Sequence, residues 1–334
     1  MNKIYEEKYR AVIAGTGSYV PEDTLTNEDM TKIVETSDEW ITTRTGIKVR
    51  HIASKDETTA TFAAEAAKKA IDNAGITAED IDVIIIGTIT PEMVFPSTAC
   101  FVQNMIGATN AWAFDVNAAC SGFVYSLSIA HQFIISGRYK NILVIGAETL
   151  SKITDYEDRN SCVLFGDGAG ALVLQRSEDG PAGIMYGCSS SDGSGWTSLN
   201  CLAYGSRNPA SRGLENPKDV YMNINGREIY QLAVRRIVEM VHDCMESCDL
   251  DIDDISMFIP HQMNARIIES VAKRLELKPE RVFINIQNYG NTSAASIPIA
   301  LDDCLREGKI KSGDIVLLAA FGAGLTWGAN LIRF

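Results

Sequence analysis

Residues 118–148 read AACSGFVYSLSIAHQFIISGRYKNILVIGAE, and residues 292–322 read TSAASIPIALDDCLREGKIKSGDIVLLAAFG. Both stretches begin with small residues, continue with the apolar spacing of a helix, stop at a glycine and pass through a charged turn into an apolar strand. Strands that are apolar throughout are expected in a sheet covered on both faces. The two stretches lie 174 residues apart, and their matched order predicts a duplicated unit.

A second pair of stretches has the same order of features. Residues 59–88 run from an amphipathic helix through an acidic turn into VIIIGT, and residues 228–261 run from a helix through DLDIDDI into SMFIPH. Any two α/β segments share some of these features, but the repeated order favours duplication. Each half is therefore predicted to be a βαβαβ unit. The N-terminal half, residues 1–178, would carry Cys120, and the C-terminal half, residues 179–334, would carry His261 and Asn291.

Three glycine-containing stretches lie outside this repeat of helices and strands. Residues 187–220 are rich in Gly, Ser and Asn and are predicted to form a long irregular loop, either a lid or a plain surface. FGDGAG at 165–170 and FGAG at 321–324 are predicted to be turns between strands, because neither has GxGxxG spacing or a following helix. A nucleotide cofactor is therefore not expected.

The composition limits the classes of function. The 334 residues carry a net charge of −13, which argues against broad nucleic-acid binding and disfavours an anionic membrane surface. A local basic patch for an acidic partner remains compatible with this charge. The eight cysteines form no CxxC pair or zinc-site spacing, so buried thiols in a reducing compartment are predicted, with no metal. The N-terminus has no signal-peptide core and no apolar run is long enough for a membrane span, so a cytoplasmic protein is predicted.

Cys120 is a candidate nucleophile. It follows an extended stretch and precedes a helical pattern, so it is predicted to lie at a helix N-terminus. Free amide N–H groups and the helix dipole there favour negative charge, and a thiol so placed is expected to have a lowered pKa. A buried structural cysteine is the alternative, and from this context alone the two interpretations are about even.

His261 and Asn291 are candidate partners of Cys120. His261 directly follows a buried strand, at the kind of strand end where ligands bind in α/β sheets, and it matches Gly87 in the first half. Asn291 precedes a helix and matches the segment that leads to Cys120. A satisfied strand-end histidine and a helix-capping asparagine are the alternatives.

Residues 36–52, TSDEWITTRTGIKVRHI, place Trp40 among Arg44, Lys48 and Arg50. A tryptophan beside arginines can stack on an adenine while a guanidinium binds phosphate. The alternative is a half-buried tryptophan beside a solvated basic face, and the residues alone favour this second interpretation.

These motifs resemble those of the β-ketoacyl-acyl-carrier-protein synthase III family over nearly the whole chain. The three central matches are AACSGF around Cys120, PHQMNARI around His261 and NYGNTSAASIP around Asn291. Further matches are SDEWITTRTGI (37–47), FPSTAC (95–100), FGDGAGALVL (165–174) and FGAGLTWGANLIRF (321–334). The resemblance implies the thiolase fold, in which duplicated halves form a five-layered α-β-α-β-α sandwich, and a homodimer.

The resemblance also implies a two-stage reaction. The Cys120 thiolate would attack a short acyl-CoA and form an acyl-enzyme. Malonyl-acyl-carrier-protein would then lose CO2, and the resulting enolate, stabilised by His261 and Asn291, would attack the acyl group. The partners implied are acyl-CoA, as a substrate rather than a cofactor, and malonyl-acyl-carrier-protein, with no nucleic acid and no membrane.

The resemblance further assigns roles to four groups of residues. The backbone N–H groups of Cys120 and Ala323 would form the oxyanion hole. CoA would bind at Trp40, Arg44, Arg159, Gly226 and Arg227. The acyl pocket would be lined by Leu164, Phe165 and Phe321, with Phe95 reaching the pocket of the partner subunit. The carrier protein would bind at Gln262, Arg266, Lys273 and Arg274.

Two positions depart from the family pattern. Ala323 stands where many members have glycine, and Arg227 stands where asparagine is expected.

A related condensing enzyme of a polyketide or quinolone pathway is the main alternative. A Cys/His/Asn hydrolase or a non-catalytic acyl-CoA-binding module is the other. The acyl primer is not determined by the sequence, because one methylene changes binding by only about 1–3 kcal/mol.

Overall fold

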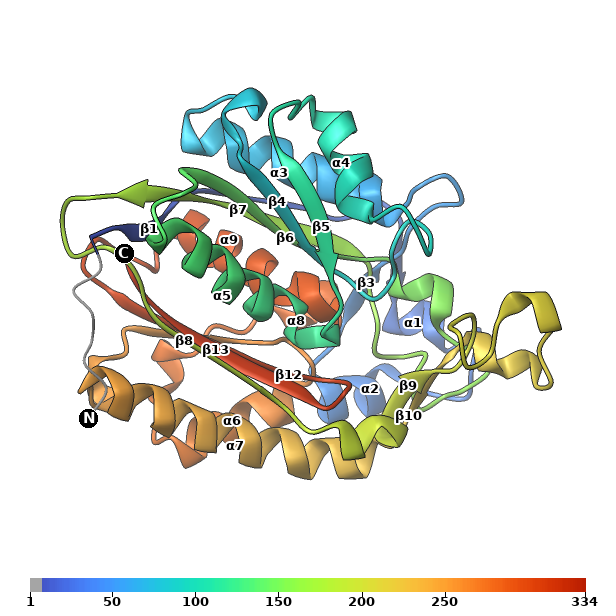
Figure 1. Cartoon of the computed structure of the whole chain (residues 1–334). Helices are drawn as coiled ribbons and strands as arrows, with labels where there is room; N and C mark the ends of the chain where they lie inside the picture. The colour runs from blue at the N-terminus through green and yellow to red at the C-terminus, as the bar shows by residue number, and fades with distance from the viewer. Residues whose placement is uncertain (1–7) are drawn as a thin grey trace.

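The computed structural model describes residues 8–334 and contains two central sheets (Figure 1). The first sheet has the strand order β1-β7-β6-β4-β5. β4, β5 and β6 are parallel to one another, whereas β1 and β7 are antiparallel to their neighbours. The strands are β1 (Arg10–Tyr19), β4 (Val83–Gly87), β5 (Trp112–Val116), β6 (Asn141–Glu148) and β7 (Gly168–Ser177).

The second sheet repeats the arrangement of the first. Its order is β11-β12-β13-β8, formed by β8 (Gly183–Ser191), β11 (Met257–Pro260), β12 (Ile315–Gly322) and β13 (Thr326–Arg333). Ile86 pairs with Ile145 between β4 and β6, and Pro260 pairs with Ala319 between β11 and β12. Both members of the second pair lie 174 residues after those of the first, so the offset predicted from the sequence is also the offset of the strand register.

The second half departs from the repeat at one strand. β5 pairs with β4 over five residues, but the equivalent segment of the second half makes a single bridge between Phe258 and Val282. The βαβαβ pattern is therefore complete in the first half and reduced at this edge in the second. β7 ends at Ser177 and β8 begins at Gly183, and the division into residues 1–178 and 179–334 stays a prediction.

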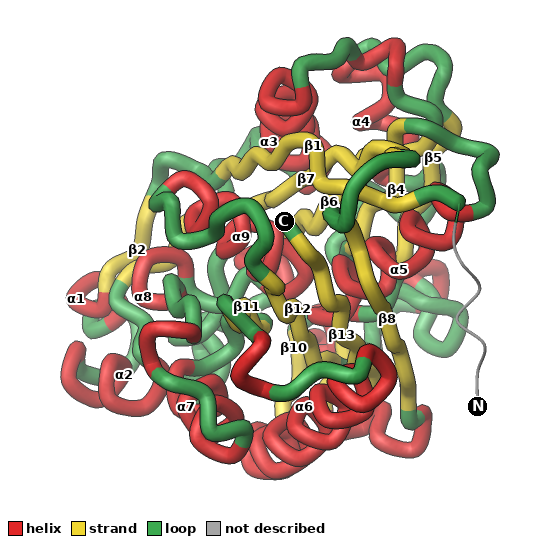
Figure 2. Tube along the Cα trace, turned by 90° about the vertical axis from the view of Figure 1, so that its left-hand side faces the viewer, coloured by secondary structure: helices red, strands yellow, loops and turns green. Residues whose placement is uncertain are grey.

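The helices form three layers around the two sheets (Figure 1, Figure 2). α3 (Thr59–Ala74) and α4 (Thr98–Ile106) cover the outer face of the first sheet, and α6 (Gly226–Cys248) and α7 (Ala265–Arg274) cover that of the second. α5 (Gly122–Ile135) and α9 (Ser296–Arg306) lie between the sheets. This gives the five-layered α-β-α-β-α sandwich that the family resemblance implied.

Local sequence explains how α3 packs so closely on the first sheet. The Thr58 side chain caps its N-terminus, and Gly75 ends it in the left-handed conformation, with a φ of 68°. Its buried face is mostly alanine, and a Cβ on Gly17 of β1 would lie only 2.6 Å from the helix backbone at Ala66 and Ala70. Small residues on both partners therefore allow the helix and strand backbones to touch.

The irregular loop predicted for residues 187–220 is partly wrong. β8 extends through Ser191, and β9 (Leu199–Cys201) pairs with β10 (Met222–Ile224). Between these pieces the chain forms short 3-10 turns (Gly193–Ser198, Ala210–Arg212 and Pro217–Val220). β9 and β10 are each only three residues long and form a small two-stranded ribbon of their own. Alternation of apolar and polar residues predicts a strand only over about four to eight residues, so these two strands are too short to be predicted from it.

The prediction that residues 165–170 form a turn between strands is also wrong. Gly168 already lies in β7, so FGDGAG leads from a loop into a strand and is not a turn between two strands. FGAG does form the turn between β12 and β13, as predicted. The remaining short elements are β2 (Thr24–Thr26), α1 (Asn27–Met30), α2 (Asp38–Thr45), β3 (Val49–His51) and α8 (Ile286–Tyr289). Over residues 8–334, none of the helices combines the length and apolar character needed to span a bilayer.

Candidate active site

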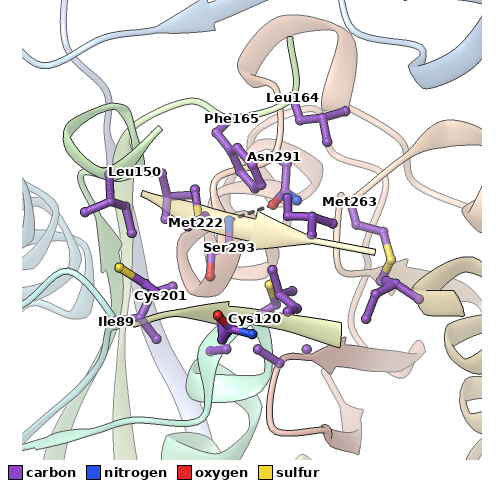
Figure 3. Close-up of a pocket in the computed structure, with 18 of the residues that line it drawn as sticks. Ile89, Cys120, Leu150, Leu164, Phe165, Cys201, Met222, Met263, Asn291 and Ser293 are labelled. Atoms are coloured by element: carbon purple, nitrogen blue, oxygen red, sulfur yellow. Dashed lines mark hydrogen bonds between the residues drawn. The ribbon is translucent and has the colours of Figure 1, made fainter. Parts of the chain in front are cut away.

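Cys120, His261 and Asn291 line one cavity of about 780 Å³. Figure 3 labels Cys120 and Asn291 in this cavity. Cys120 comes from the start of α5, His261 from the end of β11 and Asn291 from the segment before α9. The fold therefore brings together the three residues that the sequence singled out, one from the first half of the chain and two from the second.

Cys120 lies in a 3-10 turn, Ala119–Ser121, that leads directly into α5. The turn is tied to the loop after β12: the Ser121 hydroxyl donates to the carbonyl of Thr326 at 3.1 Å, and the Thr326 hydroxyl lies 2.9 Å from the carbonyls of both Ala118 and Ala323. A Cβ on Gly322 would lie 2.8 Å from the Cys120 nitrogen, so only glycine permits this approach.

The expectation that the helix terminus lowers the pKa of Cys120 is wrong. Burial raises the pKa of the thiol to about 11, and this outweighs the opposing influence of the nearby Ser293 hydroxyl. Glu148 adds to the rise, because its negative charge disfavours a thiolate. The thiol is therefore protonated at neutral pH.

His261 is almost fully buried, with 1% of its surface exposed. Its Nδ1 lies 2.6 Å from the Ser296 hydroxyl, whereas Nε2 has no hydrogen-bond partner among residues 8–334. Burial lowers the pKa of His261 to about 3, so the imidazole is neutral at physiological pH. The residue therefore presents a neutral ring to the cavity.

Asn291 is oriented by the backbone of the next turn. The Ser293 N–H donates to its Oδ1 at 2.9 Å (Figure 3). The amide NH2 group has no hydrogen bond to the described part of the chain. Its own backbone is fixed by hydrogen bonds to Leu164 and Gly166. The Oδ1 atom of Asn291 therefore makes the turn-capping bond of the alternative interpretation, while its NH2 group can still donate to a ligand in the cavity.

The residues expected at the oxyanion hole and acyl pocket lie around the same cavity, with one exception. Ala323, Leu164, Phe165 and Phe321 line it, and Ile89, Leu150 and Met222 add further apolar surface. Phe95 does not line this cavity and is 81% exposed. This position agrees with a side chain that reaches outward from its own subunit.

The residues expected to contact CoA form two groups. The guanidinium groups of Arg44 and Arg159 both stack near the Trp40 ring, 4.6 Å and 4.5 Å from its centroid. Asn264, which lines the cavity, donates to the Arg44 carbonyl at 3.0 Å, so the cluster lies beside the cavity. Gly226 lines the cavity itself. The side chain of Arg227 lies outside the described part of the chain.

The burial of two residues shows that the roles predicted for them are wrong. Arg50 does not belong to a solvated basic face, because it is fully buried and donates to the Val163 carbonyl and to Asn27. Gln262 cannot contact a carrier protein on the surface, because it is buried and its side-chain amide is bonded to Pro260, Phe283 and Asn285. By contrast, Arg266, Lys273 and Arg274 are exposed on α7.

Sequence inspection missed Ser293, Ser296 and Glu148. The two serines lie inside NTSAAS, where they look like ordinary small residues at a helix start. Glu148 ends an apolar strand, is fully buried, and its carboxylate accepts from Thr88, Ile89 and Thr90. An acidic residue that closes an otherwise apolar strand was the available signal. Among residues 8–334, no cluster of three His, Cys, Asp or Glu side chains is arranged to hold a metal ion.

Comparison with known proteins identifies the family. The model for 3-oxoacyl-acyl-carrier-protein (ACP) synthase III matches residues 114–193, and the C-terminal model of the same family matches residues 245–334. A beta-ketoacyl-acyl-carrier-protein synthase III from Caldanaerobacter subterraneus subsp. tengcongensis is 53% identical over 330 residues, which span 98% of this chain and 99% of that protein. This chain belongs to the synthase III family.

Solved structures support the same assignment for the synthase. The 3-oxoacyl-acyl-carrier-protein synthase III from Aquifex aeolicus VF5 has a TM-score of 0.90 and 49% identity, with 97% of this chain and 100% of that chain covered. The priming beta-ketosynthase of the R1128 polyketide pathway has a TM-score of 0.91 but only 32% identity, with 99% of both chains covered. The thiolase fold is thereby confirmed, while fold similarity alone does not separate fatty-acid from polyketide enzymes.

The synthase is expected to lose stability as the pH falls from 6.5 to 4.5. Burial lowers the pKa of His261 to about 3 and that of His131 to about 4, so only the unfolded state binds these two protons. Burial raises the pKa of Glu148 to about 7, so here the folded state binds the proton and the effect has the opposite sign. These three groups together leave one net proton, which corresponds to a loss of about 1.4 kcal/mol per pH unit.

Urea unfolding across this pH range measures the effect. Glu148→Gln removes the opposing contribution, so its free energy of unfolding should fall roughly twice as steeply with decreasing pH as that of the wild type. His261→Asn should show a flatter dependence than the wild type. A wild-type stability that does not change between pH 6.5 and 4.5 would contradict the burial of neutral histidines.

Proposed function

We propose that this synthase condenses an acyl-CoA primer with malonyl-acyl-carrier-protein and thereby starts fatty-acid synthesis. The observation that carries the proposal is the convergence of Cys120, His261 and Asn291 on one apolar-walled cavity. The full-length match to synthases of this name at about half identity supports fatty-acid synthesis over the related polyketide reaction. The substrates named here are those of the relatives, and they are assigned to this chain as part of the proposal.

In the first stage, Cys120 attacks the thioester carbonyl of acyl-CoA. The new bond joins the sulfur to the acyl carbon, CoA leaves, and the Cys120 proton ends on the CoA thiol. The N–H groups of Cys120 and Ala323 would stabilise the oxyanion. In support of this role, the Thr326 hydroxyl lies 2.9 Å from the carbonyls of both Ala118 and Ala323 and so ties the two turns together. The N-terminus of α5 also favours negative charge on the sulfur.

In the second stage, malonyl-acyl-carrier-protein replaces CoA and loses CO2. The electron pair of the broken bond forms an enolate, which attacks the acyl carbon on Cys120. The sulfur leaves as a thiolate and is reprotonated, and the product is a β-ketoacyl thioester on the carrier protein. The NH2 group of Asn291 and the Nε2 of His261 donate to the enolate oxygen. Neutral donors suit this step, because the charge develops only as CO2 leaves.

The CoA moiety is proposed to bind at the cluster of Trp40, Arg44 and Arg159. Both guanidinium groups already stack on the indole ring, so an adenine would have to displace one of them, preferably Arg159, to lie against Trp40. Arg44 would then remain close to the phosphates. A guanidinium is suited to this role because it pairs with phosphate oxygens through two parallel hydrogen bonds.

A homodimer is proposed on the basis of an exposed apolar surface. Val94 and Phe95 are 83% and 81% exposed, and Met93, Met105 and Trp112 are also exposed. Trp112 lies on β5, the edge strand of the first sheet, where a second copy can extend the sheet. An apolar surface of this kind on a stable protein is typical of an interface. Phe95 would then enter the acyl pocket of the partner subunit.

Reversing charge on α7 is expected to weaken recognition of the acidic carrier protein. Arg266, Lys273 and Arg274 are exposed on this helix. Arg266→Glu or Lys273→Glu should raise KM for malonyl-acyl-carrier-protein about tenfold at low salt and less at high salt, since surface charges act mainly on encounter. Steady-state kinetics measure the effect. Malonyl-CoA as the extender should show no such change, and Lys68→Glu on the distant helix α3 is the control.

Two assays test the proposed function directly. Mass spectrometry of the intact synthase after incubation with acetyl-CoA should show one acetyl group, and peptide mapping should locate it at Cys120. Addition of malonyl-acyl-carrier-protein should then discharge the acetyl group and yield acetoacetyl-carrier-protein. A synthase that accepts only malonyl-CoA in the second step would indicate the polyketide alternative. Competition among acetyl-, butyryl- and isobutyryl-CoA would determine the preferred primer.

A further inference from the structure

His261 has a buried partner that none of the roles above uses. The Ser296 hydroxyl, at the first residue of α9, lies 2.6 Å from His261 Nδ1, and both residues are at most 2% exposed. The Ser296 oxygen also accepts the Gln262 N–H at 3.3 Å. The Ser296 hydroxyl has no other hydrogen-bond partner among residues 8–334.

The hydrogen-bond capacity of these groups decides which ring nitrogen carries the proton. A serine hydroxyl has one proton to donate and two lone pairs, and one lone pair already accepts from Gln262. If Nδ1–H donated to Ser296, the serine proton would point at no acceptor in a buried site, and an unmade buried hydrogen bond is costly. If Ser296 donates to Nδ1, its hydroxyl proton has an acceptor and its oxygen still accepts from Gln262. The imidazole proton then lies on Nε2.

The duplicated fold provides an independent indication that the two residues act as a pair. The positions 174 residues earlier are Gly87 and Gly122. These glycines touch through their backbones, since a Cβ on Gly87 would lie 2.5 Å from the Gly122 carbonyl carbon. In the second half both positions carry polar side chains, and these side chains are bonded to each other. The pair is therefore present only in the half that contributes His261 to the cavity.

We propose that Ser296 is a positioning residue that holds His261 in the Nε2–H tautomer, so that the ring presents a hydrogen-bond donor, and not a base, to the cavity. Nε2 is buried and without a protein partner, and His261 lines the cavity. Because burial keeps the ring neutral, it has a single N–H to place, and the tautomer decides between donor and acceptor. The inference rests on the proposed function in assigning the thioester enolate oxygen as the acceptor.

The tautomer is directly measurable. Long-range ¹H–¹⁵N correlation spectra of the ¹⁵N-histidine-labelled synthase, at neutral pH and without substrate, distinguish a protonated from an unprotonated ring nitrogen. The sequence has four histidines, and a His261→Asn variant identifies the signals of His261. The expected result is an unprotonated Nδ1 and a protonated Nε2 in the wild type. Ser296→Ala should change this pattern toward a mixture of tautomers, and Ser296→Thr should restore it.

Kinetics provide a second readout that a purely structural role would not produce. Ser296→Ala should lower kcat for condensation about tenfold, while acetyl transfer to Cys120 should stay within twofold of the wild type. Ser296→Thr should recover condensation. Ser126→Ala is the matched control. Ser126 is also buried in a helix, but within the described residues its hydroxyl bonds to the Gly122 carbonyl alone.

The possible outcomes separate the two proposals. A protonated Nδ1 in the wild type, or a Ser296→Ala spectrum identical to that of the wild type, would overturn the role of Ser296. An equal loss of acetyl transfer and condensation in Ser296→Ala would also overturn it. If Ser296→Ala does not fold, the wild-type and Ser296→Thr spectra still decide the question. Absence of any acyl adduct on wild-type Cys120 would reject the proposed function and leave the tautomer result standing.

Discussion

Replacing Cys120 with alanine is expected to abolish acylation and to reduce condensation by at least about 10³-fold, as expected when a covalent nucleophile is removed. Cys120 lies in the turn that leads into α5 and lines the same cavity as His261 and Asn291. The loss should appear in kcat, because the binding surfaces at Trp40 and on α7 are unchanged. Intact-protein mass spectrometry with acetyl-CoA should show no adduct in the variant.

A matched cysteine variant separates chemistry from folding. Cys248→Ala, on α6 outside the cavity, removes a thiol of similar exposure and should leave acylation and condensation near wild-type values. Thermal unfolding should show that Cys120→Ala is folded, because the change is small and the surrounding turn is fixed by Ser121 and Thr326. An acyl adduct that persists on another residue in Cys120→Ala would assign the nucleophile elsewhere.

The second large expected effect is a loss of condensation without a matching loss of acylation. Asn291→Ala and His261→Ala should each lower condensation by about 10²–10³-fold, the usual effect of removing one oxyanion donor, while acetyl transfer to Cys120 continues. The reason is that enolate charge develops only in the second stage, and the acylation oxyanion is held by the backbone at Cys120 and Ala323. Single-turnover acylation and steady-state condensation should therefore diverge in these variants.

The control for this experiment is His242→Ala. His242 is an exposed histidine on α6 and does not line the cavity, so both stages should be unaffected. Decarboxylation of malonyl-acyl-carrier-protein without a primer gives a further check, because it requires the enolate but no acyl group. Equal losses of acylation and condensation in Asn291→Ala would show that Asn291 supports the cavity as a whole and not the enolate.

Features encoded by local sequence pattern could be predicted well. The helices, the apolar strands, the glycine stops and the duplication all depend on residues close together in the chain or on a fixed offset between two copies. Cys120 at a helix start and His261 at a strand end follow from the same patterns. The motifs around them, in combination and order, led to the family that the comparisons then confirmed.

Burial and contacts between the halves could not be predicted from these patterns. Gln262 and Arg50 are polar side chains of types usually found on the surface, yet both are buried with their polar groups bonded. The pKa of Cys120 depends on desolvation inside the cavity as well as on the helix terminus, and desolvation prevails. The sequence indicated the terminus but contained no measure of the desolvation.

By itself, the sequence determined the order of elements, the duplication and the identity of the three central residues, because hydrophobic periodicity and small-residue motifs are local properties. Only the tertiary structure decided that Ser296 meets His261, that Thr326 ties the Cys120 turn to Ala323, and that Phe95 points outward. The first two of these contacts depend on how separate elements of the fold pack together. That packing joins residues far apart in the chain, for which no local pattern exists.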